Sequence, residues 1–147
     1  MLNQDYKEML SILLDEKVEF LLAGAYALAA HGFPRTTGYI DIFIWPSSIN
    51  SQKVYKLLLK FGAPMGNINT NDFEKSRVIF QIGIAPRRID IINEIDCVSF
   101  DSAFEDKIIV EIDGLKVPII SKEKMIKNKE STGRNRDILD TKMLKNS

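Results

Sequence analysis

Two short apolar segments of the chain each carry a single acidic residue at their centre. Asp41 and Asp90 both stand between two isoleucines. Burial of a carboxylate in such surroundings is costly unless the charge is paired or bound to a cation. Two such acids on two strands therefore suggest one shared site. The alternative is that both acids lie at strand ends and face water.

The first third of the chain alternates between helical and extended patterns. Apolar residues recur at three-and-four spacing over residues 3–17, which predicts an amphipathic helix with Asn3 as its cap. The continuous apolar run 18–23 predicts a buried strand that Gly24 ends. The alanine-rich segment 25–31 predicts a second helix that stops at Gly32.

The rest of the chain adds strands, one hairpin and more helices. Residues 40–45, 78–82 and 89–92 read as strands. A helix follows the first of them, with Ser47, Ser48 or Asn50 as its cap, and ends before Gly62. Asp113-Gly114 between two apolar runs, 108–112 and 115–120, is a strong hairpin signal. A helical pattern runs from Lys122 to the end and breaks near Thr132-Gly133. The predicted class is α/β in the loose sense (α+β), a mixed β-sheet flanked by helices.

Length and composition exclude several classes of protein. The 147 residues, 45% hydrophobic and 27% charged, fit one domain over 1–147 with C-terminal helices from about 122. The longest apolar runs are too short to span a bilayer, and the N-terminus lacks the basic and apolar pattern of a secretory signal. A single cysteine, Cys97, fits a reducing compartment. We therefore expect a cytoplasmic protein with no membrane contact.

The residue types present also limit the metals that the chain can hold. It contains one histidine and one cysteine, too few for the usual zinc sites. Any bound metal must be a hard cation held by oxygen, which favours Mg²⁺ or Mn²⁺.

Charge is unevenly distributed, although the formal net charge is zero. From Lys122 onward the chain has eight Lys and Arg residues and four acids, so this tail carries +4 and the remainder −4. Such a tail is typical of a solvated helical face, and it also suits phosphate or nucleic acid. It lacks interleaved aromatic residues, so stacking on single strands is not indicated.

Gly24 and Ala25 form the predicted turn between the first strand and the second helix. Small residues there let a phosphate approach the backbone, and the following helix would favour an anion. The alternative, that a buried strand-to-helix turn needs small residues for packing alone, is the more common case.

Residues 39 and 41 point to the same face of the predicted strand. An Asp-x-Asp pair at these positions would aim two carboxylates at one pair of metal ions. In this chain the first of the two residues is Tyr39.

Several separated segments together resemble a known family. They are Gly24-Ala25, residues 31–38 (HGFPRTTG), residues 40–43 (IDIF), residues 88–91 (RIDI), and the tail from 120 through Asp137 and Asp140. In this order they resemble the minimal nucleotidyltransferase family of the DNA polymerase β superfold. That family includes nucleotidyltransferase-like partners of type IV toxin–antitoxin and abortive-infection systems.

The resemblance implies a nucleotidyltransferase fold whose glycine turn holds a nucleoside triphosphate. It also implies Mg²⁺ or Mn²⁺ ions that activate an acceptor hydroxyl and stabilise the leaving pyrophosphate. By position, Asp41 is the family's second acid and Asp90 its third, so both become catalytic and metal-ligand candidates. The nucleotide-binding candidates are Gly24, Ala25, Arg35, Thr37 and Lys129. Arg35 and Lys129 are chosen by charge alone, Thr37 is a weaker candidate, and His31 is best read as a helix-end residue.

Two departures from the family pattern leave two functions open. Tyr39 replaces the first acid, and a phenol with a pKa near 10 is a poor ligand for magnesium. Ala25 replaces the second Gly or Ser of the family's turn, which removes a possible hydroxyl contact and keeps the turn small. The first hypothesis is Mg²⁺-dependent transfer of a nucleoside monophosphate to an RNA or protein hydroxyl, with a degraded metal site. The second is an inactive nucleotide- or partner-binding module of a toxin–antitoxin-like system, a pseudoenzyme, whether residue 39 is natural or altered.

Overall fold

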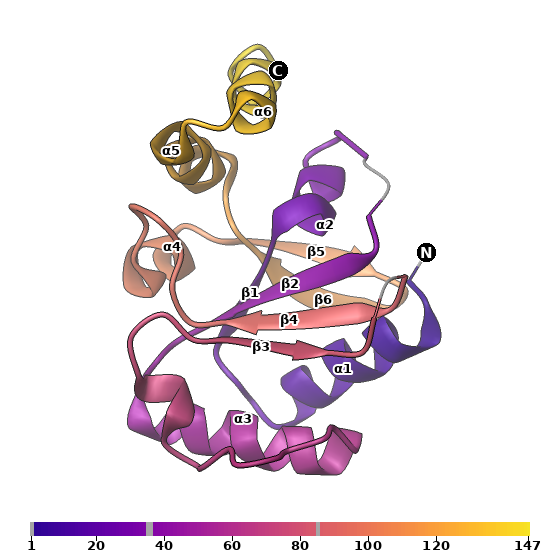
Figure 1. Cartoon of the computed structure of the whole chain (residues 1–147). Coiled ribbons are helices and arrows are strands. Elements are labelled where there is room, and N and C mark those ends of the chain that lie inside the picture. The colour runs from indigo at the N-terminus through magenta and orange to yellow at the C-terminus, as the bar shows by residue number, and fades with distance from the viewer. Residues whose placement is uncertain (1, 35–36, 85) are drawn as a thin grey trace.

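A six-stranded mixed sheet forms the centre of the molecule, and helices cover both of its faces (Figure 1). The computed structural model describes residues 2–34, 37–84 and 86–147. The strand order is β3-β4-β2-β1-β6-β5. The strands are β1 (Phe20–Ala23), β2 (Tyr39–Ile44), β3 (Ile79–Ile82), β4 (Arg88–Ile92), β5 (Ile108–Ile112) and β6 (Leu115–Ile119). The predicted mixed sheet with flanking helices is confirmed.

Two groups of helices lie on opposite faces of this sheet. Helices α1 (Gln4–Asp15) and α3 (Ser48–Phe61) cover one face, while α2 (Gly24–Ala30), α5 (Lys122–Thr132) and α6 (Asn135–Lys145) lie on the other side (Figure 1). A short helix α4 (Phe100–Glu105) and a 3₁₀ turn η1 (Asp72–Glu74) complete the elements. Within the described ranges, no helix is both long and apolar enough to cross a bilayer.

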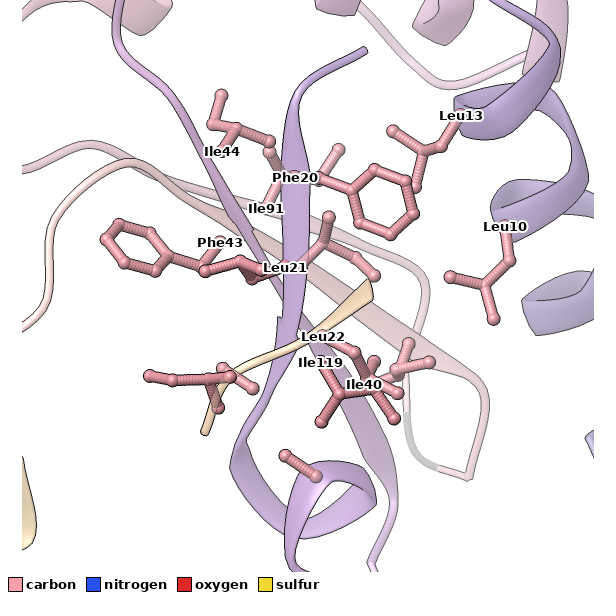
Figure 2. Close-up of a cluster of buried hydrophobic side chains, with 14 of the residues drawn as sticks. Leu10, Leu13, Phe20, Leu21, Leu22, Ile40, Phe43, Ile44, Ile91 and Ile119 are labelled. Atoms are coloured by element: carbon pink, nitrogen blue, oxygen red, sulfur yellow. The ribbon is translucent and has the colours of Figure 1, made fainter. Parts of the chain in front are cut away.

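Side chains of the central strands are buried on both faces of the sheet. Phe20 of β1 points toward Leu10 and Leu13 of α1, whereas Phe43 of β2 points to the opposite side (Figure 2). Each of these side chains is at most 1% exposed. Because successive side chains of a strand point to opposite faces, Phe43 shares a face with Asp41, and its ring contacts Phe100 of α4 with centroids 5.2 Å apart.

The register of β2 against β4 places the two strand acids directly opposite each other. The strands are parallel, and the pairs Tyr39 with Arg88 and Asp41 with Asp90 are Cα partners. Side chains of paired residues project to the same face, about 4.8 Å apart at the backbone. The intervening isoleucines of both strands enter the core on the other face.

Local signals set the helix boundaries close to those predicted. The Asn3 side chain accepts a hydrogen bond from the Tyr6 amide, and the Ser47 side chain does the same for Asn50. Gly62 ends α3 with a left-handed φ of 87°, a conformation that glycine adopts without penalty. Helix α4 was not predicted, because its six residues are too few to show a helical period.

Asn50 is a buried polar residue that ties α3 to the sheet. Its amide group donates to the carbonyl oxygens of Glu19 (3.0 Å) and Trp45 (2.8 Å), and its oxygen accepts from the Glu19 amide (2.8 Å). The side chain therefore joins the start of β1 to the end of β2. All of its polar atoms have partners, as a buried amide requires.

Replacement of Asn50 by alanine removes the side-chain partners of the Glu19 amide and the Trp45 carbonyl oxygen, while the Glu19 carbonyl oxygen still accepts from the Trp45 amide. We expect Asn50→Ala to lower the free energy of unfolding by about 2–3 kcal/mol. The exposed Gln52, two residues along the same helix, is the matched control, and Gln52→Ala should change stability by less than about 0.5 kcal/mol. Urea titration followed by circular dichroism measures both values, and equal losses would contradict this role.

Candidate functional site

The carboxylate of Asp41 rests directly on the backbone of Gly24. A Cβ atom at position 24 would lie 2.1 Å from Asp41 Oδ2, far inside van der Waals contact. Gly24 also has a φ of +64°, which L side chains rarely adopt. Both observations explain why residue 24 is a glycine. A side chain at the turn from β1 into α2 would prevent the Asp41 carboxylate from lying against it.

A pocket of about 610 Å³ opens above this contact, between the sheet and α5. Gly24, Ala25, Tyr39 and Asp41 form its floor at the turn. The cations that line it are Arg77, Lys129, Arg134 and Arg136, and the other acids are Asp96 and Asp137. Four basic and three acidic side chains therefore line the pocket, and Asp41 is the acid that lies at the turn.

The pKa of Asp41 is raised from 3.8 to about 6, and burial is the largest cause. The negative charge of Asp90 also raises this pKa, while the positive charges of Arg88 and Lys129 lower it. Asp90 acts on the pKa of Asp41 because the two residues are paired in the register of β2 and β4. Lys129, which lines the same pocket, lowers the pKa of Asp41 through its positive charge.

Asp90 is paired with an arginine of its own strand. The Arg88 guanidinium donates from Nε to Asp90 Oδ1 and from Nη2 to Oδ2, both at 2.9 Å. The same guanidinium carbon lies 4.3 Å from the centre of the Tyr39 ring. Asp90 is 5% exposed and does not line the pocket. The two acids therefore share a face of the sheet, but only Asp41 is open to the pocket.

The metal pair implied by the family resemblance does not fit these residues. Among the described residues no group of three or more His, Cys, Asp or Glu side chains could hold a metal ion. Tyr39 stands where a carboxylate would bridge two ions, and both oxygens of Asp90 accept from Arg88. Asp41 alone suits a single Mg²⁺, an ion that commonly uses one or two carboxylates together with substrate phosphates.

Lys129 lines the pocket from α5 and also joins α5 to α6. Its ammonium group lies 3.3 Å from Asp137 Oδ1 and 3.0 Å from Asp140 Oδ2. Asp137 accepts further hydrogen bonds from Thr132 and Arg134. Against the desolvation of its buried position, these partners hold the pKa of Asp137 below its ordinary value. The charge of Lys129 is therefore already shared with two acids.

The other predicted site residues do not all line the pocket. Ala25 lines the pocket beside Gly24. The hydroxyl of Thr37 instead bonds the backbone of Tyr39 and does not line the pocket, so its role in nucleotide binding stays a prediction. A ring nitrogen of His31 lies 2.9 Å from the Ile120 carbonyl oxygen, which suits a helix-end residue. Arg35 lies outside the described residues.

Sequence reasoning missed the basic residues that complete the site. Arg77, Arg134 and Arg136 line the pocket, and Arg88 neutralises Asp90. Arg88 does leave a signal in the sequence, because a residue two positions before a strand acid shares its face. Arg77 leaves none, since it lies in a loop that only the fold brings to the pocket.

Comparison with known proteins supports the fold. No family model matches the chain, and no curated protein matches its sequence. A crystal structure from Thermotoga maritima, described as a "putative nucleotidyltransferase", aligns with a TM-score of 0.60. The alignment covers 99% of this chain and 94% of that one at 17% sequence identity. At this identity the likeness shows that the chain has a nucleotidyltransferase-like fold.

The contact between Gly24 and Asp41 predicts a severe effect of one added methyl group. We expect Gly24→Ala to lower the free energy of unfolding by about 2–4 kcal/mol, because backbone strain and a clash with Asp41 act together. Gly66→Ala is the matched control, since Gly66 has a similar φ of +54° and nothing within 4 Å. It should cost only about 1 kcal/mol. Equal losses in urea titrations of the two variants would contradict the contact.

The raised pKa of Asp41 predicts a stability that depends on pH. Between pH 3.8 and about 6 the folded state binds more protons at this residue than the unfolded state, so the free energy of unfolding falls as the pH rises. Asp41→Asn removes this loss. It should stabilise the chain by about 1–2 kcal/mol at pH 7.5 and by clearly less at pH 4.5. Urea titrations at both pH values test the sign, and a gain that is the same at both would show that burial does not penalise the Asp41 charge.

Proposed function

We propose that the pocket binds a nucleoside triphosphate together with one Mg²⁺ ion and transfers its nucleoside monophosphate group slowly to a hydroxyl of RNA or protein. The observation that carries this proposal is the Asp41 carboxylate, which has no ion pair among the described residues and lies against the Gly24 turn in a pocket that four basic side chains line. A magnesium-bound polyphosphate presents the complementary charges. The nucleotidyltransferase-like fold supports the same assignment.

Each part of the pocket has a defined task in this proposal. Asp41 holds the single Mg²⁺, which when bound neutralises phosphate charge. Gly24 and Ala25 let the triphosphate approach the backbone, and Lys129 and Arg136 face its phosphate oxygens. The acceptor oxygen forms a bond to the α-phosphorus, the bond to the bridging oxygen breaks, and pyrophosphate leaves. The proton of the hydroxyl passes to solvent.

A second candidate function is nucleotide or partner binding without turnover. The observation in its favour is the pair of Tyr39 and Arg88, which removes two of the three carboxylate positions of the family pattern from metal binding. In that case the chain is the catalytically inactive member of a toxin–antitoxin-like system, and the pocket is a recognition surface. The two functions share the binding step and differ in turnover.

Arg136 offers the cleanest test of the binding step. Within the described part of the chain it has no ion-pair partner, it is exposed, and it lines the pocket. We expect Arg136→Ala to weaken the binding of a nucleoside triphosphate roughly fivefold, which corresponds to about 1 kcal/mol. Lys127→Ala removes the same charge from an exposed site of α5 outside the pocket and should leave affinity unchanged. Calorimetry with and without Mg²⁺ measures both variants.

Turnover then separates the two candidate functions. The wild-type chain is incubated with an α-labelled nucleoside triphosphate, Mg²⁺ and RNA or protein acceptors, next to Asp41→Asn. Label transferred by the wild type and lost in the variant supports the enzyme. Tight binding with no transfer by either chain supports the binding module. If none of the nucleoside triphosphates binds, the enzyme is excluded, and of the second function only partner binding remains.

A further inference from the structure

Tyr39, Arg88 and Asp90 form a layered group on the pocket face of the sheet. The Tyr39 ring lies against one side of the Arg88 guanidinium, whose edge donates two parallel hydrogen bonds to the Asp90 carboxylate. Aromatic faces attract cations, and a two-pronged contact between guanidinium and carboxylate is the strongest geometry for this ion pair. Each member of the group therefore orients the next.

The backbone holds this group in place from two sides. The Arg88 amide donates to the Gly38 carbonyl oxygen at 3.2 Å. The Tyr6 hydroxyl, reaching from α1, donates to the Arg88 carbonyl oxygen at 3.0 Å. The parallel register fixes Tyr39 beside Arg88. The guanidinium consequently starts from an anchored backbone, and little freedom is lost when it pairs with Asp90.

The group leaves Asp90 with no open position toward the pocket. Both oxygens already accept hydrogen bonds from a positive charge, and the side chain is 8% exposed. A divalent ion at Asp90 would have to displace Arg88 and bring two positive charges beside the guanidinium. Displacement would also strip Arg88 from the Tyr39 ring. Asp41, by contrast, has no ion pair among the described residues and lines the pocket.

We infer that Arg88 is the resident cation of Asp90, that Tyr39 clamps it there, and that this pair limits the site to one divalent ion at Asp41. Tyr39 then holds Arg88 in place, in addition to occupying the position where the family pattern has a metal-binding carboxylate. The inference concerns the pocket proposed above as the nucleotide site. Its test uses Mn²⁺ without nucleotide, so either conclusion can fail while the other stands.

The test counts Mn²⁺ ions on the full chain from the electron paramagnetic resonance signal of the free ion. The wild type should bind no more than one ion, and Asp41→Asn should remove it. Tyr39→Phe keeps the ring and should leave binding unchanged. Tyr39→Asp should also gain little affinity, because the new carboxylate lies beside Arg88 in the register and pairs with it.

The double variant Tyr39→Asp/Arg88→Gln should behave differently from either of its parts. It presents three carboxylates without the competing guanidinium, and we expect a second bound ion and a rise in Mn²⁺ affinity of about 10–100-fold. Arg87→Gln is the matched control, since Arg87 is the exposed neighbour outside this pocket and its loss should change nothing. Circular dichroism at the assay temperature shows that each variant is folded.

Two results would overturn the inference, and neither depends on the double variant being folded. One is a wild-type chain that binds two Mn²⁺ ions. The other is Tyr39→Asp alone reaching the affinity expected of the double variant, which would show that Arg88 does not compete. If the wild-type chain binds no nucleoside triphosphate in calorimetry but the Mn²⁺ count is as expected, the inference stands and only the proposed nucleotide function is excluded.

Discussion

The site depends on how the fold accommodates the charges of two carboxylates, Asp41 and Asp90, which lie in register on adjacent strands of an apolar sheet. The chain accommodates them in two different ways. Asp90 receives a guanidinium from its own strand, and its charge is neutralised inside the fold. Asp41 lies against Gly24, and because this turn has no side chain, the Asp41 carboxylate reaches the pocket. The first solution stabilises the sheet, while the second leaves an acid available for a ligand.

The strand pattern and its acids could be read from the sequence. Alternation around residues 40–45 and the apolar run 89–92 predict strands, and the structure places them side by side. Asp113-Gly114 predicts the hairpin of β5 and β6, which is confirmed. Local turn chemistry and side-chain period are sufficient for these features, since both act between neighbouring residues. The pairing of β2 with β4 in parallel is a property of the whole fold.

The site was harder to predict than the fold, because its cations come from distant segments. Arg77 precedes β3, whereas Arg134 and Arg136 follow the break between α5 and α6, and only tertiary packing brings them to one pocket. Lys129 was selected by charge alone. The sequence does not show that two buried acids of α6 share its ammonium group. A lysine of this kind supports both helix packing and the pocket wall, so its removal would confound binding with folding.

The aromatic stack at the far end of β2 has a practical consequence. Trp45, the single tryptophan of the chain, lies nearly parallel to the Phe100 ring at 6.0 Å, and Phe100 stacks in turn on Phe104. None of these rings lines the pocket. The indole is therefore a built-in optical reporter of whether the sheet end and α4 are assembled. We expect its emission to follow cooperative unfolding, with little interference from ligands that bind at the opposite end of the same strand.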